Sequence, residues 1–357
     1  NPSKRIRNKF RRYCWNKKIN TGKRNHCYTI ETKKGKLFCK VFNRKLRFAS
    51  QFDRTRYFVE MSALNWLKCN GCSVPNIRYA DEKNEIAFLN YIEGKTLRQT
   101  IREKPEEEVL LVRRVLEEIS KIHALEVKDS DFPEIQFKNI GADDYISTMV
   151  KDLKLVYTFL GCGNEQLDEK DYENLQRIAQ KLSSQDVKYG HFELHSDNIM
   201  VDEESIYFID FEKFHPHIPQ LDIISLTMNG NMNKHYINEY VQYYMKLNKI
   251  TDEREFLYTL DCARIFYNLK IMSMIVRNLL GYETRWREEN GKRVKDIRKL
   301  GTNFGIAWNS ERNESLEMRV RNICNFNFSK NKEIEEVQDS LFSKVLNKCI
   351  NEEKGER

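Results

Sequence analysis

The chain has 357 residues, of which 40% are apolar, and a formal net charge of +8, so it can bury one large core or two modest ones. We find no run of about eighteen uninterrupted apolar residues and no charged-then-apolar leader, and we therefore expect a cytoplasmic protein that does not span a membrane. The nine cysteines are odd in number and scattered, which argues against a disulfide framework and predicts reduced thiols.

Residues 1–24 form a basic arm that leads into the first strand, with ten Lys and Arg and no acidic residue. The rest of the chain therefore has a net charge of −2, which is the total of +8 less these ten. Ile6, Phe10 and Cys14 recur every fourth residue, which suits a helix on an anionic surface such as phospholipid, glycolipid or nucleic acid. The alternative is a solvated arm docked on its own small lobe. Nucleic acid is the least favoured partner, because the arm lacks interleaved aromatic residues on a defined fold.

Residues 25–92 are predicted to form a small lobe built on an antiparallel sheet. The segments 28–32 and 37–42 alternate or run apolar, and the sequence Lys33-Lys34-Gly35-Lys36 between them is typical of a hairpin turn. The apolar run 86–92 predicts a further strand, buried in the sheet.

One helix is expected between these strands, from about residue 56 to residue 70. Its apolar residues recur at helical spacing, as Phe58, Met61, Leu64 and Leu67. Gly71 and, beyond it, Pro75 end the pattern. Cys69 and Cys72 form a CxxC pair at this end. Because no second Cys or His pair at matching spacing accompanies them, we interpret them as packed thiols rather than as a zinc site.

Beyond this lobe the pattern is dominated by helices, which predicts a larger, mainly helical lobe over residues 93–330. The expected helices are 105–125, 142–160, 168–183, 232–247 and 252–280. A short hairpin over 199–209 is the one clear interruption that we predict. A tail over 331–357 has helical character and a charged end that we expect to fray. These elements predict an α+β protein.

Lys40 is a candidate for binding phosphate. It shares one face of its strand with Phe38 and Phe42, because the side chains of a strand alternate between its two faces. Glu60 lies along the apolar face of the following helix, where an unpaired carboxylate would be costly. Because Lys40 and Glu60 both lie on apolar faces and have opposite charges, we predict an ion pair between them. This pair would orient the ammonium group of Lys40 toward a phosphate. Taken singly, each residue also fits an edge charge whose head reaches water.

The loop Thr21-Gly22-Lys23-Arg24-Asn25-His26 follows the first strand. Its backbone amides could fold over phosphates, which makes Gly22 and Asn25 candidates for nucleotide binding. A single glycine is a weak signal, and an ordinary polar hairpin turn is the alternative.

The segment from Glu193 to Asp210 carries the strongest signal. Two apolar segments around the short acidic turn 203–205 predict a hairpin, so the chain leaves Asn198 and returns to Asp210 at the same end. An amide oxygen and a carboxylate thereby meet, and Mg²⁺ takes such oxygen ligands from one or two protein groups together with phosphate oxygens. Glu193 precedes Asn198 by five residues, and we expect it across the loop, where a base orients an attacking hydroxyl.

With these residues the sequence resembles the aminoglycoside phosphotransferase and choline kinase superfamily, whose members are protein-kinase-like enzymes that phosphorylate small molecules. The catalytic loop of the superfamily reads H-G-D-x-H-x-x-N and is followed by an I-D-F/W motif. The resemblance covers roughly residues 13–280 and rests on Lys40, Glu60, a hinge at Leu89-Asn90-Tyr91-Ile92 before Glu93-Gly94, His191 to Asn198, Ile209-Asp210-Phe211 and Asp222. It implies a two-lobe fold with a small antiparallel-sheet N-lobe and a mainly helical C-lobe.

The resemblance also implies how ATP is held. Lys40 would contact the α- and β-phosphates, with Glu60 holding it in place. Asn90 and Ile92 would meet the adenine through their backbones. The sequence leaves GTP open as an alternative nucleotide.

The same resemblance assigns Mg²⁺ to the end of the hairpin. Asn198 and Asp210 would hold the ion, and Glu212 would assist them. Asp222 would brace the catalytic loop.

This chain departs from the superfamily at the catalytic position. Glu193 stands where the superfamily has Asp, and Phe192 stands where it has Gly. Glu keeps the acceptor charge but is one methylene longer, and misplacing a reacting group by about an ångström costs on the order of a hundredfold in rate. Asp197 is a conceivable substitute base, although we expect it to face the loop or solvent. His191 and His195 are interpreted as residues that brace the loop.

The sequence thus predicts an ATP- and magnesium-dependent phosphotransferase that moves the γ-phosphate to a hydroxyl of a small molecule or sugar, with Glu193 in the position of the base. The alternative, a nucleotide-binding pseudokinase with a regulatory or scaffold role, is supported by the same Glu193. Residues 281–300 hold seven Lys and Arg against four Asp and Glu, which favours a neutral or anionic acceptor over a polycationic one. A phosphorylated sugar, a nucleotide-like metabolite or a lipid-linked glycan would suit such a site.

Overall fold

The computed structural model describes residues 14–19, 25–33, 35–43, 54–128, 130–137, 140–159, 167, 169–203, 205–228, 232–279, 282–289, 292–299, 319–343 and 345. The chain divides into two compact units. The first holds Asn1–Lys138, Lys188–Pro216 and Trp286–Lys295, and the second holds Asn139–Val187, His217–Arg285 and Asp296–Arg357. The arm and lobe boundaries predicted at residues 24, 92 and 330 remain predictions.

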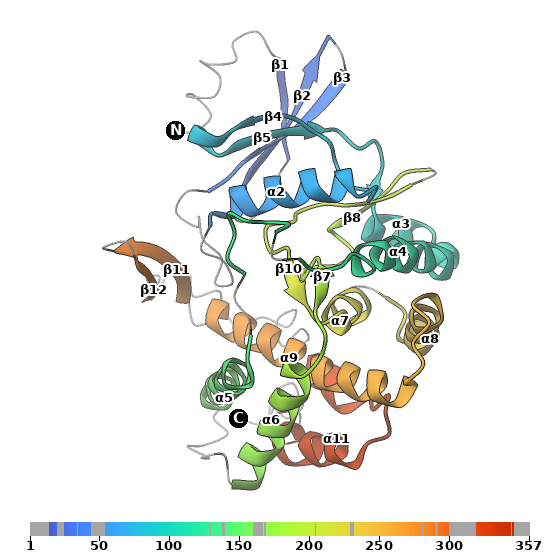
Figure 1. Ribbon diagram of the computed structural model, residues 1–357, viewed down its shortest axis with the longest axis vertical. Helices are drawn as coiled ribbons and strands as arrows, with labels where there is room; N and C mark the ends of the chain where they lie inside the picture. Colours follow the sequence, from blue (N-terminus) through green and yellow to red (C-terminus); the bar gives the residue numbers. More distant parts are fainter. Residues whose placement is uncertain are drawn as a thin grey trace, which may run out of the picture. The chain divides into compact units, whose positions relative to one another are not determined.

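The first unit contains a five-stranded antiparallel sheet (Figure 1). Its strands lie in the order β1 (Cys14–Ile19), β2 (His26–Thr32), β3 (Gly35–Val41), β5 (Ile86–Asn90) and β4 (Ile77–Asp81). The predicted hairpin is confirmed, and Gly35 at its turn has φ +111°, a backbone conformation that glycine adopts without strain. Buried apolar side chains on β2, β3 and β5 make one cluster, formed by Ile30, Cys39, Val41, Ile86 and Phe88.

Helix α2 (Arg56–Cys69) packs beside this sheet (Figure 1) and confirms the predicted helix. The Thr55 side chain accepts a hydrogen bond from the backbone N–H of Phe58, which caps the first turn. The helix ends at Asn70, and Gly71 follows in the left-handed region at φ +76°. Of the two nearby cysteines, Cys69 is exposed and Cys72 is buried.

A second, three-stranded sheet of the first unit has the order β6 (Lys95–Thr96), β8 (Ile199–Val201) and β9 (Ile206–Phe208). The hairpin predicted over 199–209 is therefore present. Gly94, directly before β6, lies so close to β8 that a Cβ there would be 2.3 Å from the backbone oxygen of Val201. Helix α3 (Leu97–Glu103), a 3₁₀ turn (Pro105–Glu107) and α4 (Glu108–His123) follow β6 along the chain.

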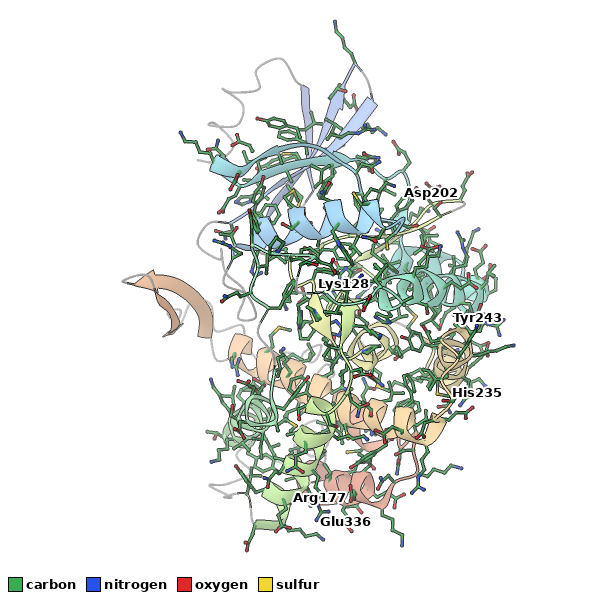
Figure 2. The ribbon with its side chains drawn as sticks, viewed as in Figure 1. Lys128, Arg177, Asp202, His235, Tyr243 and Glu336 are labelled. Atoms are coloured by element: carbon green, nitrogen blue, oxygen red, sulfur yellow. The ribbon has the colours of Figure 1, made fainter. Side chains whose placement is uncertain are left out.

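The second unit is mainly helical. Helices α5 (Ala142–Phe159), α6 (Glu169–Ser183) and α7 (Gln220–Met228) pack on α9 (Glu253–Leu279), and α8 (Ile237–Leu247) follows a 3₁₀ turn (Lys234–Tyr236). The predicted helices in this part of the sequence are confirmed, with ends shifted by a few residues. Helix α11 (Lys332–Val337) contacts α6, and it continues into a π-helical turn (Gln338–Phe342). Figure 2 labels Arg177 on α6 and Glu336 on α11.

Several elements differ from the sequence prediction. The expectation that 199–209 would be the one interruption among the helices is wrong, because β11 (Tyr282–Glu289) pairs with β12 (Lys292–Lys299) and β7 (Lys188–Gly190) pairs with β10 (His215–His217). The strands β11 and β12 are rich in charged residues, so they lack the apolar alternation that identifies a strand. Strand β4 was missed for the same reason, since most of its residues are exposed. Among the described residues, no helix is both long and apolar enough to cross a membrane.

Candidate active site

Lys40 on β3 lies among three carboxylates. Its Nζ is 2.7 Å from Glu60 Oε2, 2.6 Å from Asp210 Oδ1 and 2.9 Å from Glu212 Oε1. The ion pair with Glu60 on α2 is the pair that the sequence predicts. Lys40 and Glu60 are only 4% and 1% exposed, so water screens their attraction poorly. The sheet, α2 and the segment after β9 therefore meet at one buried ammonium group.

The charges of this cluster set the pKa values of its members. Burial alone would lower the pKa of Lys40, but the carboxylates of Asp210, Glu212 and Glu60 outweigh it and raise the pKa well above its ordinary value. Burial raises the pKa of Glu60 to about 8 against the opposing charge of Lys40, and the two neighbouring carboxylates add to the increase. Burial would also raise the pKa of Glu212, yet Lys40 and Arg56 hold it down to about 2. Lys40 and Glu212 are thus held in their charged forms.

Glu212 is held by donors on both of its carboxylate oxygens. Oε1 accepts a hydrogen bond from Asn25 and lies beside Lys40, and Oε2 accepts one from Arg56 Nη1 at 3.1 Å. Asn25 in turn accepts from the backbone N–H of Asn43 at 3.1 Å. The predicted phosphate loop connects β1 to β2, and its Asn25 end is tied to Glu212. Gly22, its other candidate residue, lies outside the described residues.

Asn198 and Asp210 lie together at the open end of the hairpin, as the sequence predicts. Ile199 pairs with Phe208, and the N–H of Ile209 donates to the carbonyl of Asn198 at 3.0 Å. The Nδ2 of Asn198 donates to a backbone carbonyl at 3.0 Å, so Oδ1 is the atom of this side chain that can ligate a cation. Asp210 has φ +68°, in the left-handed region that Asp tolerates better than most residues.

Glu193, which the sequence predicts in the position of the base, forms an ion pair with Lys213 through its carboxylate. Phe192, directly before it, has φ +65°. A residue with a Cβ in this left-handed region costs about 1–2 kcal/mol. The ring of Phe192 is buried and its centroid lies 4.7 Å from that of His215, so packing offsets the strain.

Two histidines contact the backbone of the predicted catalytic loop or its neighbours. His191 is fully buried, and its Nε2 lies 2.8 Å from the carbonyl of Ile209. Its Nδ1 accepts from the backbone N–H of Glu193 at 3.4 Å. The backbone N–H of His195 donates to the carbonyl of Glu193 at 2.8 Å, and burial lowers the pKa of its imidazole. The expected bracing role agrees with these contacts.

Asp197 and the residue before it contact Arg98 on α3. Its carboxylate forms an ion pair with Arg98 on α3 at 2.9 Å, and the backbone N–H of Arg98 donates to the carbonyl of Ser196 at 3.2 Å. These contacts fasten the loop to α3. The side chain of Asp197 is 47% exposed, which agrees with the expectation that it faces the loop or solvent.

The predicted adenine-binding residues are Asn90, the last residue of β5, and Ile92. The backbone N–H of Asn90 donates to the carbonyl of Asn76 at 2.9 Å, so this N–H is not available to a nucleotide. Ile92 lies beyond the end of the strand. Asp222 belongs to α7 in the second unit, where it is fully buried and its Oδ2 lies 3.6 Å from Nε2 of His217.

Sequence reasoning missed Arg56 and Lys213, which contact the predicted site residues Glu212 and Glu193, and Arg98, which contacts Asp197. Arg56 precedes Glu60 by one helical turn, and this spacing places both on one face of α2, which could have identified it. Lys213 directly follows Glu212 in sequence, but nothing local indicates that it pairs with the catalytic loop. Arg98 carries no sequence signal of its pairing with Asp197.

The donor set of the site fits Mg²⁺. Ligand oxygens of Glu60, Asp210 and Glu212 all lie within 4.8 Å of one another, and carboxylate and amide oxygens are the ligands that Mg²⁺ takes. The oxygens of Glu212 are both engaged by protein donors. The side chain of Asp210 is 40% exposed, so of the three it is the one most open to a cation that keeps its water and phosphate ligands.

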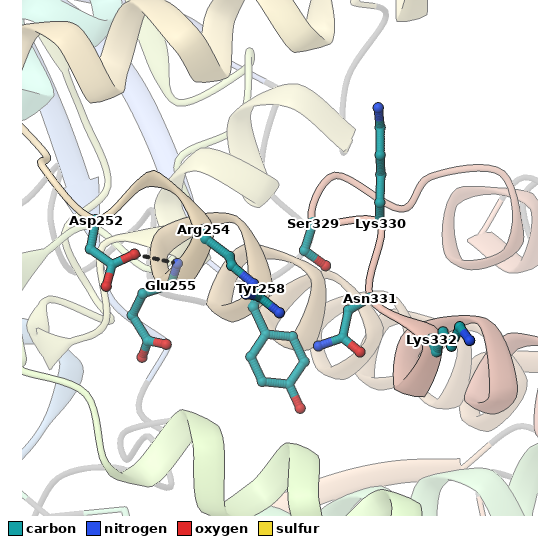
Figure 3. Close-up of a pocket in the computed structure, with 8 residues that line it drawn as sticks. All are labelled: Asp252, Arg254, Glu255, Tyr258, Ser329, Lys330, Asn331 and Lys332. Atoms are coloured by element: carbon teal, nitrogen blue, oxygen red, sulfur yellow. Dashed lines mark hydrogen bonds between the residues drawn. The ribbon is translucent and has the colours of Figure 1, made fainter.

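A cavity of about 490 Å³ lies in the second unit (Figure 3). Its lining residues are Asp252, Arg254, Glu255, Tyr258, Ser329, Lys330, Asn331 and Lys332. Asp252 accepts from the backbone N–H of Glu255 at 2.9 Å, as Figure 3 shows, and so caps α9. The carboxylate of Glu255 binds Lys181. Because its acids serve capping and ion pairing and none of its residues was predicted for the site, we do not assign the chemistry to this cavity.

A family model covers the part of the chain that holds the candidate active-site residues. The model of a family described as "Phosphotransferase enzyme family" matches residues 16–255. This range includes Lys40 and the three carboxylates around it, Glu60, Asp210 and Glu212. No curated protein matches the sequence.

Two solved structures illustrate the likeness. A choline/ethanolamine kinase family protein from Mesorhizobium loti has a TM-score of 0.54 and 14% identity, with 93% of this chain and 91% of that chain covered. The choline kinase LicA from Streptococcus pneumoniae has a TM-score of 0.53 and 16% identity, with 91% and 99% covered. At these identities the likeness concerns the fold, and it confirms the predicted α+β, protein-kinase-like fold of small-molecule kinases.

Proposed function

Because the chain belongs to the phosphotransferase enzyme family, we propose that it moves the γ-phosphate of ATP to a hydroxyl group of a small molecule or sugar. The observation that carries this proposal is the convergence of Lys40 with Asp210 at 2.6 Å, beside Asn198 at the same end of the hairpin. An ammonium group and two oxygen donors at one point are what a metal-bound triphosphate requires. Phosphoryl transfer depends mainly on such positioning and charge neutralisation.

Each residue of the cluster has a role in this proposal. Lys40 binds the α- and β-phosphates, and Glu60 holds its ammonium group while a phosphate replaces the contact with Asp210. Glu212, fixed by Arg56 and Asn25, braces Lys40 from the other side. This bracing role suits Glu212 better than metal ligation, because both of its oxygens already accept from protein donors.

Asn198 and Asp210 would hold the Mg²⁺ ion, which neutralises phosphate charge when it is bound. The carbonyl of Asn90 and the N–H of Ile92 would accept and donate hydrogen bonds to the adenine. GTP is the other nucleotide that the backbone of this segment could hold.

Glu193 is the residue that orients the acceptor hydroxyl. Its carboxylate accepts the hydrogen bond of that hydroxyl and so aligns the oxygen for attack. Since the transition state of phosphoryl transfer is largely dissociative, orientation contributes more than strong basicity. A Glu in this position is therefore compatible with transfer.

The acceptor class rests on the sequence and on the family. The similar structures named above are a choline/ethanolamine kinase family protein and a choline kinase, which by their names act on small molecules. The positive charge of residues 281–300 favours a neutral or anionic acceptor, such as a phosphorylated sugar. The basic arm over residues 1–24 is a candidate for contact with an anionic surface that presents the acceptor.

Calorimetric titration with Mg·ATP tests the nucleotide site. Lys40→Met and Asp210→Asn each remove a charged contact and are expected to weaken binding at least about tenfold. Lys36→Met is the matched control, because Lys36 lies on the same strand but pairs with Glu93 at the surface, and its affinity is expected to stay within about twofold. Binding that survives both site variants unchanged would refute the proposal.

The second candidate function is a nucleotide-binding pseudokinase, and the observation that favours it is the ion pair between Glu193 and Lys213, which occupies the carboxylate. Transfer of radioactive phosphate from ATP to a panel of sugars, amino alcohols and nucleosides distinguishes the two. An enzyme labels one class of acceptor, and Glu193→Gln reduces the labelling. A pseudokinase binds Mg·ATP and labels none of the acceptors.

A further inference from the structure

Lys213 contacts the carboxylate of Glu193, which the proposed function places beside the acceptor hydroxyl. Its Nζ forms an ion pair with Glu193 Oε1 and lies 5.9 Å from the centroid of the Phe192 ring. The side chains of Lys213 and Glu193 are 18% and 29% exposed, so the pair is partly shielded from water. Both residues belong to the first unit.

The turn that carries Lys213 is firmly anchored. Phe211 and Phe214 are both fully buried, and the N–H of Phe214 donates to the carbonyl of Phe211 at 3.1 Å. The carbonyl of Lys213 lies 2.7 Å from Nδ1 of His215. The backbone of Lys213 is thus fixed on both sides, and its ammonium group can hold a partner at a defined place.

Glu193 needs such an anchor more than an Asp would. Its carboxylate is one methylene farther from the backbone, which adds a rotatable bond and therefore more conformations. Because an ångström of misplacement in a reacting group costs on the order of a hundredfold in rate, a free Glu at this position would orient an acceptor poorly. A bonded ammonium group restricts the carboxylate to one conformation.

We propose that Lys213 is a positioning residue that fixes the carboxylate of Glu193 where it orients the acceptor hydroxyl, so that the two residues together replace the Asp of the superfamily motif. This inference rests on the proposed function. Lys213 binds Oε1 of Glu193, and the acceptor hydroxyl would donate its hydrogen bond to the carboxylate that this ion pair holds in place. Lys213 acts through Glu193 and makes no contact with the nucleotide.

The test uses slow hydrolysis of ATP by the full chain, because water can take the place of the unidentified acceptor. The variants are Lys213→Met, Lys213→Arg, Glu193→Gln and the double variant Lys213→Met/Glu193→Gln. Lys213→Met is expected to lower the hydrolysis rate about ten- to hundredfold with the Kd for Mg·ATP within about threefold of the wild type. Lys213→Arg retains the cation and is expected to keep most of the rate. Lys104→Met is the control, since Lys104 pairs with Glu107 at the surface.

The double variant decides how Lys213 acts. If Lys213 works through Glu193, the double variant hydrolyses ATP at the rate of Glu193→Gln alone, because the two losses are not additive. If the rate losses of the two single variants multiply in the double variant, Lys213 acts independently of Glu193, and the inference is overturned. A Kd for Mg·ATP that rises tenfold in Lys213→Met would place Lys213 on the nucleotide and would also overturn it. A wild-type chain that binds Mg·ATP but hydrolyses it no faster than buffer would also count against the inference. Failure of the wild type to bind Mg·ATP would instead contradict the proposed function.

Discussion

Arg56 on α2 donates a hydrogen bond to the carboxylate of Glu212 across 3.1 Å, although 156 residues separate them in sequence. The contact joins the first turn of α2 to the turn that follows β9. Lys40 lies 2.9 Å from the other oxygen of the same carboxylate. Two cations from different elements thus share one buried acid.

Arg56→Met removes one of these cations, and we expect a loss of about 1.5–3 kcal/mol in the free energy of unfolding, the usual value of a hydrogen bond to a charged group. The loss is limited because Lys40 and Asn25 still hold Glu212. Denaturant unfolding measures it, with Arg102→Met on the exposed face of α3 as the control. Equal stability of the two variants would show that the contact contributes little.

Gly94→Ala tests the close approach of the residue before β6 to β8. The added Cβ would meet the backbone oxygen of Val201 at 2.3 Å, and a backbone oxygen held in a sheet cannot move away cheaply. We expect a loss of about 1–3 kcal/mol, as for other overpacked sites. Gly141→Ala is the matched control, because no heavy atom lies within 4 Å of its added Cβ. A similar melting temperature for both variants would contradict the prediction.

The strained backbone of Phe192 predicts an unusual order of stabilities. Both Phe192→Ala and Phe192→Gly lose the packing of a buried ring, at a cost of about 3–5 kcal/mol. Ala keeps a Cβ at φ +65°, whereas Gly relieves a strain of about 1–2 kcal/mol. The Gly variant is therefore expected to be the more stable of the two in urea unfolding. Greater stability of the Ala variant would mean that the loop relaxes to a negative φ.

His195 predicts how stability depends on pH. Burial lowers the pKa of its imidazole below the ordinary value of about 6.5, so the unfolded chain binds a proton more readily than the folded one. Stability is thus fully present above about pH 6.5 and is lost as the pH falls through the lowered pKa. His195→Gln is expected to flatten this part of the profile. Unfolding in urea at a series of pH values measures it, and parallel profiles would rule the effect out.

Much of the site could be predicted because its signals are local. Two short apolar segments and a turn predict the hairpin between Asn198 and Asp210. The geometry of a hairpin then brings the amide and the carboxylate together. The pair of Lys40 and Glu60 could be predicted because each charge occupies an apolar face of its own element. In both cases a few neighbouring residues determine the arrangement.

The rest could not be predicted because it depends on contacts between distant segments. Nothing near Lys213 indicates that its ammonium group reaches Glu193, and nothing near Arg98 indicates that it reaches Asp197. Strand β4 lies at the edge of the sheet, and most of its residues are exposed. Its sequence therefore lacks the apolar alternation that would predict a strand. The left-handed backbone of Phe192 runs against the preference of its side chain, and the fold around it imposes that conformation.

The four-residue turn from Phe211 to Phe214 links two ion pairs of the site. Its two buried rings act as fixed points, and the residues between them reach in different directions: Glu212 to the lysine of the sheet and Lys213 to the catalytic loop. Because these two residues are neighbours in the chain, a substitution that displaces the turn would disturb the ion pair with Lys40 and the ion pair with Glu193 together.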